Sequence, residues 1–135
     1  MPHIIVLGTL DTKLSEILYL RSQLEKTSVA GASPLKVTLI DCGRTSSIQH
    51  DTINVFQSDL VTEYGAPDKA GYLSSMPRGE VVEYMIACTT ACVKRIFQKE
   101  DVHGILSAGG SGGTTLAAAV MREAVPIGVP KLIAR

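Results

Sequence analysis

The sequence Ser107-Ala108-Gly109-Gly110-Ser111-Gly112-Gly113-Thr114-Thr115 joins an apolar run, Val102 to Leu106, to a helix-like run, Leu116 to Glu123. This order is typical of a strand, a turn and a helix. Four glycines within five positions let the backbone turn sharply and leave its N–H groups unshielded. At a helix N-terminus such a turn favours anions, because unpaired N–H groups and the positive end of the helix dipole point to one place. The stretch therefore predicts a phosphate site.

Similar patterns on either side of this stretch predict the rest of the fold. Short apolar runs predict further strands, at Ile4 to Leu7, Val37 to Ile40 and Lys131 to Ala134, besides the one at Val102 to Ser107. Apolar residues at helical spacing predict helices at Lys13 to Thr27 and Glu80 to Lys99. Alternating strands and helices predict an α/β fold, a Rossmann-like three-layer sandwich whose mostly parallel sheet has about four strands.

The length of 135 residues predicts one Rossmann-like domain over residues 1–135. Residues 44–79 interrupt the pattern, since they are rich in Ser, Thr, Asp, Gly and Pro and fit neither a helical nor a strand period. We interpret this long irregular segment as a lid or a partner surface. A short helix at Asp59 to Tyr64 is the alternative that its sequence leaves open.

A second candidate loop, Gly8-Thr9-Leu10-Asp11-Thr12-Lys13, follows the first predicted strand. If the second and third strands flank the first, the point where the strand order reverses brings this loop beside Gly109 to Thr114. Lys13 could then neutralise phosphate charge, and Asp11 could hold Mg²⁺ or orient a hydroxyl group. The alternative is that Asp11 and Thr12 only cap the following helix and that Lys13 is a solvated first-turn residue.

Asp41 ends the second predicted strand, where Rossmann-like sites often place a carboxylate for ribose hydroxyls. An Asx turn that caps the next segment explains the residue equally well. The glycine-rich stretch matches neither common nucleotide motif: Thr115 stands where Gly-x-Gly-x-x-Gly needs its third glycine, and no Gly-Lys-Ser/Thr follows.

Gly109-x-Ser111-x-Gly113 also fits the nucleophile elbow of α/β-hydrolases. In that fold the base histidine follows the serine, whereas all three histidines here, His3, His50 and His103, precede it. This order favours Ser111 as a hydroxyl donor to phosphate. A serine hydrolase that uses Ser111 remains the alternative enzyme.

The composition favours a soluble, cytoplasmic protein. Thirteen basic and thirteen acidic residues cancel without forming blocks, so nothing indicates a nucleic-acid or membrane partner. No apolar run approaches the ~20 residues that cross a bilayer. The cysteines, Cys88 and Cys92 among them, fit reduced core thiols rather than a metal site.

Several of these segments together resemble the tomato mosaic virus resistance protein (Tm-one-like) ATP-binding family. They are Gly8 to Lys13 followed by Glu16, Ile40-Asp41-Cys42-Gly43, Arg78-Gly79-Glu80, Gly109-Gly110-Ser111-Gly112-Gly113-Thr114 and Pro126-Ile127-Gly128-Val129-Pro130-Lys131. The resemblance covers nearly all of the chain.

The resemblance implies an ATP-binding Rossmann-like domain. Our own interpretation is a binding or regulatory module for ATP, which Mg²⁺ could accompany. Members of the family continue beyond the Pro-Lys segment, so the chain is expected to be the first subdomain only. A nucleotide-dependent enzyme completed by the missing region is the alternative. A sheet edge left open in this chain would favour a homodimer.

Overall fold

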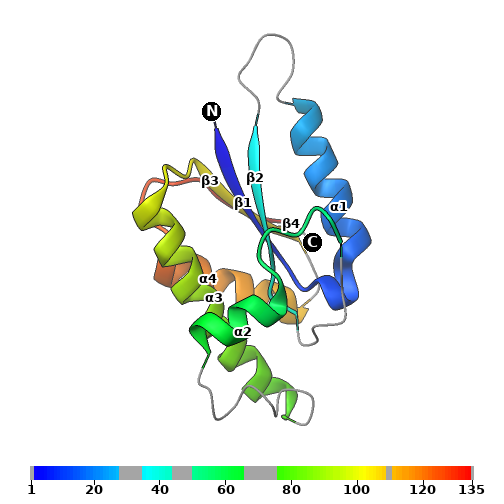
Figure 1. Cartoon of the computed structure of the whole chain (residues 1–135), viewed down its shortest axis with the longest axis vertical. Coiled ribbons are helices and arrows are strands. Elements are labelled where there is room, and N and C mark those ends of the chain that lie inside the picture. Colours follow the sequence, from blue (N-terminus) through cyan, green and yellow to red (C-terminus); the bar gives the residue numbers. More distant parts are fainter. Residues whose placement is uncertain (1, 28–34, 44–49, 66–75, 109–110, 135) are drawn as a thin grey trace.

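The structure is a computed structural model that describes residues 2–27, 35–43, 50–65, 76–108 and 111–134. Strands and helices alternate along this chain as the sequence predicts (Figure 1). In chain order the elements are β1 (His3–Gly8), α1 (Leu10–Thr27), β2 (Lys36–Asp41), α2 (Gln57–Tyr64), α3 (Arg78–Lys99), β3 (Gly104–Ala108), α4 (Ser111–Ala124) and β4 (Lys131–Ala134).

The four strands form one sheet in the order β2-β1-β3-β4, and all of its strand pairs are parallel. The second and third strands therefore flank the first, and the strand order reverses between β1 and β3. Parallel strands need crossover connections, and the helices provide them. The predicted α/β class and the Rossmann-like sandwich are confirmed.

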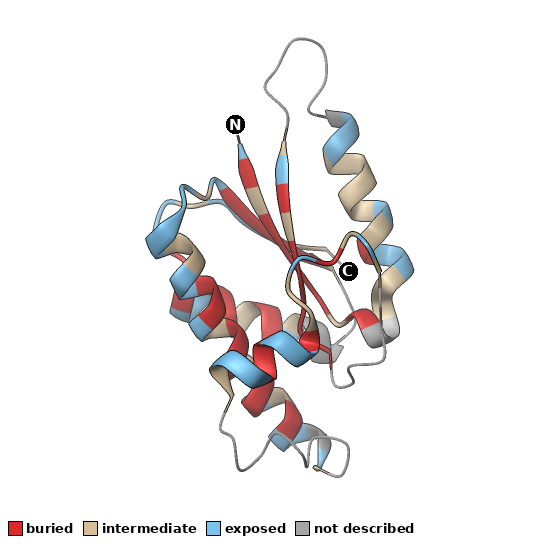
Figure 2. Cartoon of the chain, in the orientation of Figure 1, coloured by how far each residue is buried: buried red, intermediate tan, exposed pale blue. Residues whose placement is uncertain are grey.

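Helices cover both faces of the sheet (Figure 1). On one face, α1 packs over a cluster of buried apolar residues that includes Val6, Ile17 and Leu39. On the other face, α3 and α4 pack over a larger cluster centred on Ile5 and Leu7, and α2 packs against α3. Strands β1 and β3 are the most deeply buried elements, whereas no residue of β4 is buried (Figure 2). Each fully buried Val, Leu or Ile side chain in these clusters contributes roughly 1.5–3 kcal/mol to stability.

The two edges of the sheet differ. Along the outer edge of β2, Val55 forms a parallel bridge with Ile40, and the Leu39 carbonyl accepts hydrogen bonds from the Asn54 and Val55 N–H groups. No described residue pairs with the outer edge of β4. Beside that edge, Leu132 is 61% exposed.

The irregular segment at 44–79 contains ordered structure in its middle. Asn54 and Val55 pair with the edge of β2, and the chain then leads into α2. This helix begins two residues before the alternative helix suggested by the sequence and ends with it at Tyr64. Residues 44–49 and 66–75 lie outside the described part of the chain, so the prediction of a lid or partner surface stays a prediction there.

Candidate functional site

The carboxyl rim is the edge of the sheet where β1, β2 and β3 end, at Gly8, Asp41 and Ala108. In this register Leu7 lies opposite Ser107, and Gly8 lies opposite Asp41. The buried Ser107 hydroxyl donates a hydrogen bond of 2.8 Å to the Leu7 carbonyl and joins β1 to β3 at this rim. The segments that follow β1 and β3 therefore leave the sheet from neighbouring positions, as the strand order predicts.

The glycine-rich stretch forms a larger part of α4 than the sequence predicts. The helix begins at Ser111 rather than at Leu116, so Ser111 to Thr114 form its first turn. The N–H groups of a first turn have no acceptor within the helix and carry the positive end of its dipole. Gly109 and Gly110 lie outside the described residues, and the side chain of Ser111 is not described.

Thr114 lies in this first turn with a half-buried side chain. Its Oγ1 atom is buried, and it has no hydrogen-bond partner in the part of the chain that the structure describes. Leaving a buried hydroxyl without a partner costs about 1–3 kcal/mol. The first turn of α4 therefore presents N–H groups that have no acceptor within the helix and, within the described chain, one buried hydroxyl group without a partner at the carboxyl rim.

The loop after β1 also differs in detail from the prediction. Helix α1 begins at Leu10 rather than at Lys13, but the backbone at Lys13 is not helical (φ −126°, ψ 22°) and kinks the helix there. The Lys13 N–H donates to the Thr9 carbonyl at 2.9 Å. The predicted helix start thus coincides with a kink. The side chains of Asp11 and Thr12 are not described, so their predicted roles stay predictions.

Gly8 has a packing role at the rim. A Cβ atom at this position would lie 2.7 Å from Ile17 Cγ1 and 3.1 Å from Leu10 Cδ2. Its carbonyl accepts hydrogen bonds from the N–H group of Cys42 at 2.9 Å and from its Sγ atom at 3.3 Å. The absence of a side chain therefore brings the start of α1 close to the end of β1. A direct contact of Gly8 with a ligand stays a prediction.

The Asp41 side chain links the start of α1 to the segment that follows β2. Its side chain is 1% exposed, and Oδ1 accepts hydrogen bonds from the N–H groups of Leu10 (3.2 Å) and Gly43 (3.0 Å). The bond to Gly43 is the Asx turn that the sequence allowed, and the bond to Leu10 places a carboxylate at the N-terminus of α1, where the helix dipole favours it. A contact with ribose stays a prediction for this residue.

Charged groups at the opposite, amino rim are paired with one another. The backbone N–H of His3 donates to His103 Nδ1 at 3.0 Å, and His3 Nε2 lies 2.7 Å from Thr38 Oγ1. Lys36 Nζ forms an ion pair with Glu100, whose Oε1 lies 3.8 Å from His3 Nδ1. Burial lowers the pKa of His3, although the Glu100 carboxylate opposes this shift.

This arrangement bears on the hydrolase alternative. His3 lies at the amino end of β1, and His103 directly precedes β3, whereas Ser111 follows the carboxyl end of β3. A strand of five residues spans roughly 16 Å, so neither histidine can act as a base for Ser111. His50 lies on the segment beyond β2, two strands away from β3. The positions of these histidines do not support a hydrolase.

Cys88 and Cys92 face the core from α3, as the sequence predicts. Both thiols are free, and burial raises the pKa of Cys92 to about 11 and also raises that of Cys88. Such thiols react slowly at neutral pH. Within the described residues, no three His, Cys, Asp or Glu side chains form a group that could hold a metal ion. The helices described here are all too short or too polar to cross a membrane.

Two features of the structure were not predicted from the sequence. One is the hydrogen bond from the Ser107 hydroxyl to β1, for which the only signal in the sequence was a serine at the end of a predicted strand. The other is a pocket of about 690 Å³ between α2 and α3, whose wall includes Tyr64 and Tyr84. Tyr64 lies in the irregular segment and Tyr84, twenty residues later, in the next predicted helix, so no motif indicated the pocket.

Comparison with known proteins identifies the family of this chain. Residues 2–135 match the family model described as "Uncharacterised protein family (UPF0261) N-terminal domain". A UPF0261 protein of Clostridium tetani is 34% identical over 96% of this chain and 30% of its own length, and one of Rhizobium meliloti is 33% identical over 98% and 30%. The ToMV susceptible protein tm-1(GCR26) of Solanum lycopersicum is 27% identical over 98% of this chain and 18% of its own length.

The chain thus spans less than a third of the length of these relatives. The predicted link to the tomato proteins is confirmed at the level of the family. With a match along nearly its whole length, the chain belongs to the UPF0261 family and corresponds to its N-terminal domain.

Proposed function

We propose that the carboxyl rim binds the phosphates of ATP or a related nucleotide and that the domain is a binding or regulatory module. The observation that carries this proposal is the position of the first turn of α4. Ser111 to Thr114 lie where the strand order reverses between β1 and β3. In open parallel sheets, ligands bind outside the carboxyl ends of the strands at such a point.

Thr114 supports the proposal independently. Its buried Oγ1 atom lacks a partner among the described residues, and a phosphate oxygen would give this hydroxyl an acceptor. The first-turn N–H groups would donate to the same anion. In this arrangement the backbone supplies most of the contacts, which explains why neither common nucleotide motif is needed.

The other predicted residues take supporting roles. Lys13 and Thr9 lie at the start of α1 on the same rim, where an ammonium group and a hydroxyl group suit a polyphosphate. Asp41 positions this loop through Leu10, and the ribose contact proposed for it would be additional. We expect Mg²⁺ to bind chiefly through the phosphates, with Asp11 as the candidate carboxylate.

Calorimetric titration with ATP, with and without Mg²⁺, tests this proposal. We expect Gly112→Val to abolish measurable binding, because a branched side chain beside the first-turn N–H groups hinders the approach of phosphate. Ala91→Val, at an exposed position of α3, is the matched control and should bind as the wild type does. Absence of ATP binding to the wild type would refute nucleotide binding by this chain.

Thr114→Val separates binding from folding. We expect ATP affinity to fall by about tenfold while stability is unchanged or higher, because the valine removes a buried hydroxyl without changing the volume of the side chain. Thr89→Val is the control: this hydroxyl on α3 is also buried without a partner among the described residues, but it lies in the core. It should leave ATP affinity unchanged. Equal ATP affinity in both variants would remove the role assigned to Thr114.

A further inference from the structure

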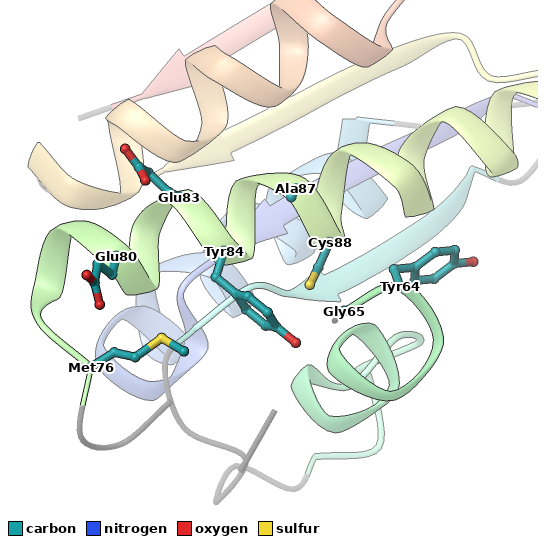
Figure 3. Close-up of a pocket in the computed structure, with 8 residues that line it drawn as sticks. All are labelled: Tyr64, Gly65, Met76, Glu80, Glu83, Tyr84, Ala87 and Cys88. Atoms are coloured by element: carbon teal, nitrogen blue, oxygen red, sulfur yellow. The ribbon is translucent and has the colours of Figure 1, made fainter. Parts of the chain in front are cut away.

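The pocket between α2 and α3 is lined by aromatic and sulfur-containing side chains. Tyr84 and Cys88 extend from the side of α3 that faces α2, Met76 lies before the first turn of α3, and Tyr64 ends α2 (Figure 3). The volume of about 690 Å³ lies within the range of small-molecule sites.

Close backbone packing defines one wall of this pocket. A Cβ atom at Gly65 would lie 2.1 Å from Tyr84 Oη and 2.6 Å from the Val61 carbonyl oxygen. The chain therefore passes directly against the Tyr84 hydroxyl at the end of α2. Because Tyr84 is 9% exposed and belongs to the core cluster, its ring has a fixed position in the wall.

Both charged side chains that the described residues contribute to the lining of this pocket are negative, and the Arg95 guanidinium lies outside the lining, where it donates to the Tyr64 hydroxyl at 3.5 Å. Glu80 and Glu83, in the first two turns of α3, are the charged lining residues, and neither forms an ion pair within the described chain. Figure 3 shows Glu80 near Met76 and Glu83 extending from α3 toward α4. Carboxylates on the α3 wall of an aromatic pocket, with no ion-pair partner in the described chain, attract cations and repel anions such as nucleotides.

We propose that this pocket binds a small organic cation, a substituted ammonium group on a compact apolar body. The tyrosine rings receive the cation on their faces, the apolar body contacts Met76, and the two glutamates supply the opposite charge. Because the glutamates are exposed to solvent, the affinity of a simple probe is expected to be on the order of millimolar.

Methyl NMR with choline as the probe tests this proposal. The protein has four methionines. Met76 lines the pocket, whereas Met85 and Met121 are buried in the core and serve as internal controls. We expect choline to shift the Met76 methyl signal in a saturable way. The uncharged isostere dimethylbutanol, in which carbon replaces the nitrogen, should bind at least about tenfold more weakly, because it lacks the cation.

Three variants locate the site. Glu80→Gln combined with Glu83→Gln should weaken choline binding by about tenfold, because both opposite charges are lost. Ala87→Trp should abolish binding, because Ala87 is exposed on the pocket wall and the larger side chain fills the space. The control, Glu16→Gln combined with Glu123→Gln, changes the same charge at exposed positions of α1 and α4 and should bind as the wild type does.

Each variant changes exposed side chains, so a folded protein is expected, and the core methionine signals confirm it in the same spectrum. Equal affinity for choline and dimethylbutanol, no shift at millimolar choline, or full binding by the Glu80 and Glu83 double variant would each overturn the proposal. No nucleotide is present in the experiment, so its failure is distinct from a failure of ATP binding at the carboxyl rim.

Discussion

The two rims of the sheet satisfy their polar groups in different ways. At the amino rim, Lys36, Glu100, His3 and His103 interact with one another through ion pairs and hydrogen bonds. At the carboxyl rim, the first turn of α4 leaves its N–H groups without acceptors within the helix, and Thr114 carries a buried hydroxyl with no partner in the described chain. Both rims contain polar groups, but among the described residues of the two rims only Thr114, at the second, has a buried hydroxyl without a partner.

This difference separates polar groups that stabilise the fold from groups that are available to a ligand. At a rim whose charges are paired, the pairs stabilise the fold, and few groups are available to bind an anion. A rim with unsatisfied donors loses stability, and a protein retains such donors chiefly where a ligand uses them. Asp41 is the exception at the carboxyl rim, because its buried carboxylate serves the fold.

The largest loss of stability is expected when the Asp41 carboxylate is removed. Asp41→Ala leaves the N–H groups of Leu10 and Gly43 without their acceptor, and we expect the free energy of unfolding to fall by about 3 kcal/mol. Asp59→Ala is the control, since this exposed carboxylate accepts a hydrogen bond from the Phe56 N–H at 3.2 Å, and it should cost about 1 kcal/mol or less. Urea denaturation measures both. Equal losses would show that Asp41 does not hold the carboxyl rim together.

A smaller, pH-dependent effect is expected at the amino rim. Since burial lowers the pKa of His3, the unfolded chain binds more protons between that lowered value and 6.5. The stability that neutral His3 provides is complete above pH 6.5 and is lost as the pH falls through the folded-state pKa. The slope is at most about 1.4 kcal/mol per pH unit.

His3→Gln should remove this part of the pH dependence, measured as urea denaturation at several pH values between about 5 and 7.5. The charged groups that face His3 are Glu100, Lys36 and His103. The acidic transition of Glu100 lies lower, because its pKa is lowered from 4.5, chiefly by a hydrogen bond from Lys36. His50→Gln is the control and should keep the slope. An unchanged slope in His3→Gln would contradict the assignment.

The smallest effect is expected from the open edge of the sheet. Asn54 and Val55 cover the edge of β2, whereas the outer edge of β4 has no partner among the described residues. Because Leu132 is 61% exposed beside that edge, we expect two copies to pair weakly along β4. Light scattering across a concentration series measures this association, and Leu132→Glu should reduce it. A monomer at all concentrations would contradict a homodimer.

Much of the fold could be predicted from the sequence because strands that are buried on both faces are continuous apolar runs. Lys131 to Ala134 was predicted at both ends, although β4 is not buried, and the order in which β2 and β3 flank β1, which was a condition of the predicted site, is the one found. The starts of the helices were less accurate. Glycine disfavours helices, so α4 was expected at Leu116, but its buried residues Ala117 and Val120 hold the helix against the sheet from Ser111 onward.

The candidate site could be predicted only in outline. The glycine-rich stretch and the loop after β1 were placed at one rim by strand order alone. The hydrogen bond between Asp41 and Leu10 joins residues that are 31 positions apart, so no local pattern indicated it. The pocket between α2 and α3 could not be predicted either, because tertiary packing creates it.

The most direct test of the difference between the rims is the two-dimensional NMR spectrum of the backbone amides during a titration with ATP. We predict the largest shifts at Ser111 to Thr114 and at Gly8 to Lys13, and little change at His3, Lys36 and His103. Shifts confined to the amino rim, or ATP binding that leaves Ser111 to Thr114 unchanged, would contradict the assignment of the carboxyl rim as the nucleotide site.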